Sequence, residues 1–142
     1  MIAKVLSNTK DRLNQHLKNS FDINDDCIIV NKIIETNGSS PKENQNKVVI
    51  TLINLDSNPD LVNEDYDIKI LVTSDFNDYI ESLKFLDTVL QFFKANEIIS
   101  DPSLPNDIAN AEFVLDLMSH NDLHNIWTAL GAKYKPSIVY KI

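Results

Sequence analysis

The segment LHNIWTALGAKYKPSIVYKI, residues 123–142, decides the fold of this chain. The apolar residues of its first half recur at the spacing of one helix face: Leu123, Ile126, Trp127 and Leu130. Gly131 is the residue type that commonly ends helices, and Pro136 prevents the helix from resuming. Alternating residues then mark one face of a last strand: Ile138, Tyr140 and Ile142. A short helix followed at once by a strand is typical of a small α/β (α+β) domain whose last strand joins a sheet.

Two longer helices are predicted upstream. Apolar residues at helical spacing run over residues 2–18. Ser74 and Asp75 are both suitable N-caps for a second helix that extends to about Ala95. We expect its apolar face to hold Phe76, Tyr79, Ile80, Leu83, Leu86, Val89, Leu90 and Phe93, and to be widened beyond a single stripe by Phe85 and Phe92. Ser119 is the predicted N-cap of the short helix in the C-terminal segment.

Five segments have the alternation or the β-branched content of strands: residues 27–34, 47–55, 66–73, 111–118 and 137–142. The first is nearly continuous in apolar residues, which predicts a strand buried on both faces. Polar loops join the first three strands, so we expect an antiparallel meander. A short strand at residues 97–99 is a further candidate. The predicted order is α-β-β-β-α-β-α-β, with a mixed, mostly antiparallel sheet flanked by helices in one compact domain.

Length and charge limit the classes of partner. A chain of 142 residues fits one domain, residues 1–142. Its formal net charge of −8 repels phosphate backbones and anionic lipids, so we expect neither nucleic acid nor a membrane as a partner. The first residues continue directly into an amphipathic pattern, and no apolar stretch has the length of a membrane span. We therefore expect the protein to fold in the cytoplasm.

The residues that support catalysis or cofactor binding are scarce. Cys27 is the one cysteine, and it lies in an apolar run where a thiol usually packs as a small core residue. Two glycines in the whole chain are too few for a phosphate-binding loop. His120 and His124, four residues apart, have the spacing of two metal ligands, but no firm third ligand accompanies them. We interpret both as solvated polar residues, and we expect no cofactor, no metal and no enzymatic activity.

The aromatic and basic residues of the C-terminal segment are the candidate interface. Trp127 fits a core position, because helical spacing separates it from Leu123 and Leu130. The two tyrosines are equally compatible with the core and with a contact surface. Lysines in the segment either bind an acidic partner or protect a strand edge. The full candidate set is Trp127, Lys133, Tyr134, Lys135, Ile138, Tyr140 and Lys141.

Three segments carry a resemblance to a known family: NKVVITLINLD at residues 46–56, SLKFLDTVLQFF at 82–93, and residues 123–142. The most specific is the pattern W-x-x-L-G-x-K-Y-x-P-S-x-x-Y-K at residues 127–141. With the opening MIAKVLSNTKDRLNQHL, the likeness spans nearly the whole chain. The chain resembles the cap proteins of contractile injection systems, the tail-terminator family of phage-tail-like particles such as the antifeeding prophage and the virulence-cassette machines.

That resemblance implies a structural role and a fold similar to that of phage tail-terminator proteins. In the family, six copies form a ring on the last rings of the inner tube and the sheath and stop their growth. The resemblance thus implies a homohexamer, with tube and sheath subunits as partners and assembly in the cytoplasm within a particle that is later released. The connection at residues 56–65 is short for the family, and members often continue past Ile142, which leaves open a second, smaller cap paralogue.

Two expectations about assembly follow. Six copies at −8 each would carry 48 negative charges, so contacts between protomers should be apolar or should pair the few lysines. We also expect the strand at residues 137–142 to lie near a sheet edge and to pair with a strand of a neighbour. The alternative functions are a baseplate or tube-completion component of the same machine, and a small metal-dependent enzyme that uses His120 and His124.

Overall fold

A mixed five-stranded sheet with strand order β1-β2-β3-β7-β6 forms the centre of the computed structural model, which describes residues 2–57, 66–100 and 110–142. A separate two-stranded sheet contains β4 and β5. The elements are α1 (Ile2–Phe21), β1 (Ile28–Val30), the 3-10 helix η1 (Lys42–Asn44), β2 (Lys47–Ser57), β3 (Tyr66–Asp75), α2 (Tyr79–Ala95), β4 (Ile98–Ser100), β5 (Asn110–Glu112), β6 (Val114–Asp116), α3 (His120–Leu130) and β7 (Ser137–Lys141).

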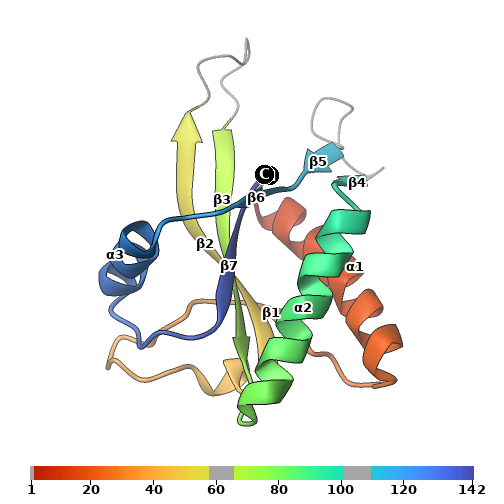
Figure 1. The fold of residues 1–142 in the computed structure, drawn as a ribbon, viewed down its shortest axis with the longest axis horizontal. Helices are drawn as coiled ribbons and strands as arrows, with labels where there is room; N and C mark the ends of the chain where they lie inside the picture. Colours follow the sequence, from red (N-terminus) through yellow and green to blue (C-terminus); the bar gives the residue numbers. More distant parts are fainter. Residues whose placement is uncertain (1, 58–65, 101–109) are drawn as a thin grey trace.

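Helices cover both faces of the central sheet, which gives a three-layer α+β domain. Figure 1 shows α1 and α2 on one side of the sheet and α3 on the other. The larger apolar cluster lies under α1 and α2 and includes Leu13, Ile50, Ile70 and Val89, none of which is exposed. The smaller cluster lies under α3 and centres on Trp127. The two clusters follow from the period of the strands, because successive residues of β2 and β3 face opposite layers.

The predicted α+β class and the mixed, mostly antiparallel sheet are confirmed, whereas the predicted order of elements is incomplete, because three strands (β4, β5 and β6) lie between α2 and α3. β2 pairs antiparallel with β3, β3 with β7, and β7 with β6. The predicted meander is wrong at its first connection, because β1 pairs parallel with β2. The expected strand buried on both faces is wrong too. β1 has three residues and lies at a sheet edge, and the chain then leaves the sheet so that Ile33 and Ile34 pack in the cluster under α3.

Helix α2 begins later than predicted. Ser74 and Asp75 are the last residues of β3, where they pair with Val48 and Lys47. Asp78 is the N-cap, and its side chain accepts a hydrogen bond of 3.1 Å from the N–H of Glu81. The residues that α2 buries are Ser82, Phe85, Val89, Phe92 and Phe93. They include the two phenylalanines expected to widen the apolar face, whereas Tyr79 and Ile80, also expected on that face, are exposed. Ser74 and Asp75 therefore extend β3 by pairing with β2, although both are residue types that commonly cap a helix.

Helix α1 ends at Phe21, three residues after the predicted position. Asp22 adopts a positive φ of 51°, and the N–H of Ile23 donates to the carbonyl oxygen of Lys18 at 3.1 Å. This is a left-handed helix stop, which satisfies one of the free carbonyls of the last turn. The extra turn places Phe21 against Phe85 of α2, with ring centroids 4.1 Å apart.

The predicted strand at residues 111–118 is two strands in different sheets. β5 pairs with β4, whereas β6 pairs with β7. Phe113 lies between them, buried, and its N–H donates to the carbonyl oxygen of Glu97 at 2.7 Å. Asp56 and Ser57, expected in the connection at residues 56–65, are the last residues of β2. The rest of that connection, and residues 101–107, for which we expect a loop, lie outside the described residues. Among the helices that the structure describes, none combines the length and apolarity needed to cross a membrane.

Candidate functional site

The helix–strand segment at the C-terminus folds as its sequence predicts. The side chain of Ser119 accepts a hydrogen bond of 3.1 Å from the N–H of Asp122 at the start of α3. Gly131 ends the helix with a positive φ of 70°, a conformation that costs glycine little. Its N–H donates to the carbonyl oxygens of Trp127 and Thr128. The two caps fix where α3 begins and ends, and the end of α3 sets where the chain returns to the sheet.

Trp127 is a core residue, as its helical spacing predicts. Its side chain is 4% exposed and packs in the smaller cluster with Val49, Leu71 and Val139. Its ring lies edge-on to Tyr134, with centroids 5.5 Å apart. Trp127 thus packs against Tyr134, but because Trp127 is buried it offers almost no surface of its own to a partner.

Tyr134 and Lys133 are the accessible residues of the candidate interface. Tyr134 is 63% exposed, and Lys133 is exposed beside it. Tyr140 differs, because it is 2% exposed and its ring centroid lies 4.4 Å from that of Phe93. Burial raises the pKa of Tyr140 to about 12. Ile138 is half-buried and packs against the same cluster under α1 and α2. Burial therefore separates the candidate set into core and surface residues.

Two of the three lysines in the segment are bound within the chain. Lys135 Nζ lies 2.7 Å from Asp75 Oδ2 and donates to Ser40 Oγ at 3.2 Å. Lys141 Nζ lies 2.9 Å from Asp67 Oδ2. Both ammonium groups stabilise the attachment of β7 to β3, the strand that carries both carboxylates.

The last strand lies one strand in from the edge of the sheet and is not itself the edge strand, and its pairing with a strand of a neighbour stays a prediction. β7 pairs with β3 on one side and with β6 on the other, so it is an interior strand of the described sheet. β1 and β6 are the edge strands. Of the strand predicted at residues 111–118, only the part that forms β6 pairs with β7, and the alternation of neither segment reveals this pairing.

His120 and His124 are exposed at the start of α3, as predicted for solvated polar residues. His124 Nε2 lies 3.4 Å from Thr128 Oγ1, its neighbour one turn along. Within the described part of the chain, no group of three or more His, Cys, Asp or Glu residues is placed to hold a metal ion. Cys27 is buried, and burial raises the pKa of its thiol. Asn14 Oδ1 accepts from the N–H of Cys27 at 3.1 Å, which ties β1 to α1.

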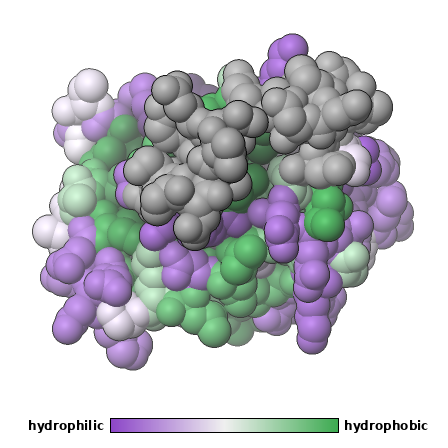
Figure 2. Space-filling view, turned by 90° about the horizontal axis from the view of Figure 1, so that it is seen from above, coloured by the Kyte–Doolittle hydropathy of each residue, from purple (hydrophilic) through white to green (hydrophobic). Residues whose placement is uncertain are grey.

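An apolar surface on α2 and β6 was not among the candidate residues. Leu83, Leu86 and Leu90 are half-buried on one side of α2, and Leu115 on β6 is 38% exposed. Leu90 and Leu115 both line a groove of about 300 Å³ between the two elements. We call Leu83, Leu86, Leu90 and Leu115 the α2–β6 surface. Figure 2 shows apolar side chains, in green, reaching the molecular surface between polar ones.

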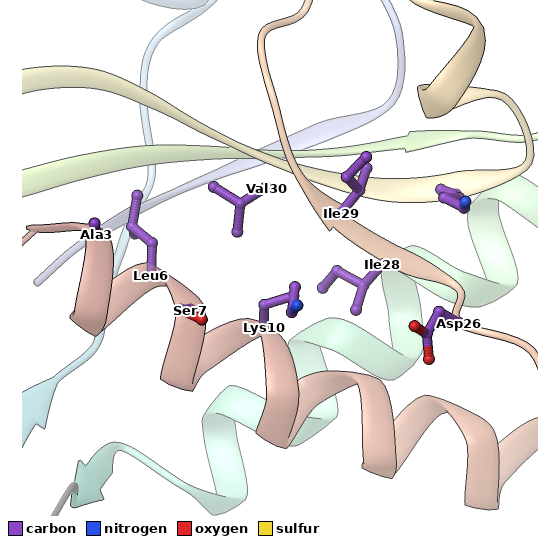
Figure 3. Close-up of a pocket in the computed structure, with 9 residues that line it drawn as sticks. Ala3, Leu6, Ser7, Lys10, Asp26, Ile28, Ile29 and Val30 are labelled. Atoms are coloured by element: carbon purple, nitrogen blue, oxygen red, sulfur yellow. The ribbon is translucent and has the colours of Figure 1, made fainter. Parts of the chain in front are cut away.

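A second groove of about 380 Å³ lies between α1 and the edge strand β1 (Figure 3). Ser7 and Lys10 of α1 line one side, and Ile28 and Val30 of β1 line the other. Asp26 lies at one end of the groove, where it accepts hydrogen bonds from Lys18 Nζ at 2.8 Å and Asn14 Nδ2 at 2.9 Å. The hydrogen bond from Lys18 is the main cause that lowers the pKa of Asp26. No sequence signal marked this groove, because the apolar run at residues 27–34 was interpreted as a strand buried on both faces.

The protein is an α+β domain, and its candidate functional site consists of accessible surfaces that can contact other proteins. Comparison with protein families gives the class: residues 7–142 match the Pvc16 N-terminal domain, so the chain belongs to that family. It is a component of a contractile injection system of the phage-tail-like type that includes the antifeeding prophage and the virulence cassettes. The resemblance found in the sequence is thereby confirmed at the level of the family. No curated protein matches the chain.

Proposed function

We propose that this protein is the cap that ends the inner tube and the sheath of a contractile injection particle, and that it acts as a ring of six copies. The observation that carries the proposal is the match of residues 7–142 to the Pvc16 N-terminal domain. Membership in this family suggests a structural component that assembles with other parts of the particle. In the proposal those parts are the tube and sheath subunits, and the particle assembles in the cytoplasm before its release.

The charge of the protein supports apolar contacts between copies. Each copy carries −8, so six would place 48 negative charges in one ring. Like charges across a contact are unfavourable, and two of the C-terminal lysines are already bound to carboxylates of their own chain. The α2–β6 surface supplies apolar side chains, and Val114 beside it is 51% exposed. In the proposal this surface contributes to the contact between protomers.

The remaining candidates of the C-terminal segment fit the same scheme. Tyr134 and Lys133 are exposed in the linker that follows α3, and the ring of Tyr134 lies against Trp127 of that helix. A terminator needs one surface that binds the last ring of the polymer and another that does not accept a further ring. We assign Tyr134 and Lys133 to contacts with the tube or the sheath, because their aromatic and cationic groups are accessible there.

The experiment is electron microscopy of negatively stained particles from cells that lack this protein. The proposal predicts tubes or sheaths of uncontrolled length, or ragged ends opposite the baseplate, and wild-type length on complementation. A baseplate component would give few or no particles. Particles of wild-type length and end structure would contradict the cap assignment.

A further inference from the structure

The outer edge of β1 carries backbone groups that the sheet does not use. The carbonyl oxygen of Cys27 accepts from the N–H of Val48 at 2.8 Å, and the N–H of Asn31 donates to the carbonyl oxygen of Ile50 at 3.1 Å. In a parallel ladder, alternate residues of a strand bond to the same neighbour. Cys27, Ile29 and Asn31 therefore face β2, and the N–H and carbonyl groups of Val30 point away from it. Val30 is 38% exposed, so these groups lie at an accessible edge.

The groove beside β1 is continuous with this edge. Ile28 belongs to the cluster under α1 and α2, whereas Ile29 packs in the cluster under α3, and both line the groove. Because residues from both faces of the sheet line this groove, the groove lies at the edge of the sheet. Figure 3 shows Ser7 and Lys10 of α1 next to Ile28 and Val30. An extended segment bound at this rim would place alternate side chains on the two faces, as any added strand does.

Lysines line the groove in a protein that is otherwise strongly acidic. Lys10 forms an exposed pair with Asp11 at 3.3 Å, a contact that contributes little. Lys47 makes no ion pair with any residue that the structure describes. Asp26, the acidic residue in the lining, is already bound by Lys18. The groove therefore favours a ligand that brings carboxylates.

We propose that the edge of β1 and its groove bind an extended, acidic segment of a second polypeptide of the particle, which adds a strand to the sheet at Val30 and places carboxylates near Lys10 and Lys47. Charge complementarity selects this occupant over a neutral or basic strand, because Lys10 and Lys47 both line the groove and its one acidic lining residue, Asp26, is already bound by Lys18. The inference does not depend on the cap assignment, since any component of the particle can use such an edge.

Hydrogen exchange tests the added strand directly. The amide of Val30 is compared in the isolated protein and in purified particles by mass spectrometry, with the amide of Val49 in the sheet centre as internal reference. A bound strand predicts exchange at Val30 that is about tenfold slower or more in the particle. Equal exchange in the two states would overturn the proposal.

Photo-crosslinking in the assembled particle identifies the occupant. A photo-reactive amino acid replaces Ser7, which is exposed and lines the groove, and a control replaces Ser20, which is exposed on α1 outside it. The proposal predicts a cross-link from position 7, and none from position 20, to an acid-rich segment of a particle subunit. A cross-link to nucleic acid, to a basic segment, or to no subunit at all would contradict it.

Charge reversal tests the role of the lysines. Lys10→Glu with Lys47→Glu is expected to reduce the cross-link by about tenfold or more, because the groove would then repel acidic side chains. Lys4→Glu with Lys42→Glu changes the net charge equally at exposed positions outside the groove and should leave the cross-link unchanged. An equal loss in both double variants would show a general charge effect and overturn the assigned site. Particle length, measured in parallel, reports on the cap proposal separately.

Discussion

Lys135 Nζ lies 2.7 Å from Asp75 Oδ2, and this ion pair joins the linker two residues before β7 to the last residue of β3. The two side chains are 22% and 24% exposed, so the pair is largely shielded from water. The N–H of Ser74 also donates to the carbonyl oxygen of Pro136 at 3.0 Å. The ion pair and this hydrogen bond hold the linker between α3 and β7 against the sheet, and thereby position Tyr134.

We expect Lys135→Ala to destabilise the isolated protein by about 1–2 kcal/mol, because Asp75 would keep a partly buried charge without its partner. Lys133→Ala removes the same charge at an exposed position and should change stability by less than about 0.5 kcal/mol. Urea unfolding of both variants measures the difference. Equal stability of the two variants would show that the ion pair of Lys135 with Asp75 does not stabilise the fold.

Trp127→Ala should destabilise the protein by about 3–5 kcal/mol, since it opens a cavity in the cluster under α3. Tyr134→Ala, by contrast, removes an exposed ring and should cost less than about 1 kcal/mol in the isolated chain. The two variants separate the aromatic residue of the core from that of the surface. Loss of particle association in Tyr134→Ala at unchanged stability is the expected second result. If Tyr134→Ala binds particles normally, Tyr134 lies outside the contact.

Tyr140 gives the protein a sensitivity to alkaline pH. Burial raises its pKa from 10.0 to about 12, so the unfolded chain loses the phenol proton at lower pH than the native protein does. The free energy of unfolding that depends on the neutral phenol of Tyr140 is fully present below pH 10. It falls by about 2–3 kcal/mol in total as the pH rises toward 12. Tyr140→Phe should remove this loss. The measurement is urea unfolding of both proteins at neutral and alkaline pH, and parallel losses of stability would contradict the assignment.

Assembly should depend on the α2–β6 surface. Leu86→Glu places a charge on this surface, and we expect it to make the proposed ring of an already acidic protein dissociate to smaller species. Asn125→Glu adds the same charge at an exposed position on α3 and should leave assembly intact. Light scattering after size exclusion measures the mass, which is six times that of one chain for the ring. A wild-type mass for Leu86→Glu would place the protomer contact elsewhere.

The sequence predicted the local features of the fold better than the pairing of its strands. Ser119, Gly131 and Trp127 behave as expected because caps and helical periodicity depend on neighbouring residues. The position of β7 in the sheet interior depends on β6, a strand of three residues whose pairing no local pattern specifies. β1 was misplaced because an apolar run has no period that distinguishes an edge strand from a central one.

The candidate surfaces illustrate the same limit. Lys135 and Lys141 were candidates either to bind an acidic partner or to protect a strand edge. The carboxylates that they bind, Asp75 and Asp67, lie far away in sequence and meet them only through the pairing of β3 with β7. Lys10 and Lys47 were not singled out, because α1 and β2 bring them to one groove only after folding. Surfaces built from distant segments require the tertiary structure.

The length distribution of tubes in cells that lack this protein tests the central claim most directly. The claim predicts a broad distribution that extends well past the wild-type length and narrows again when the gene for this chain is restored. A narrow distribution at the wild-type length in its absence would show that another component ends the particle.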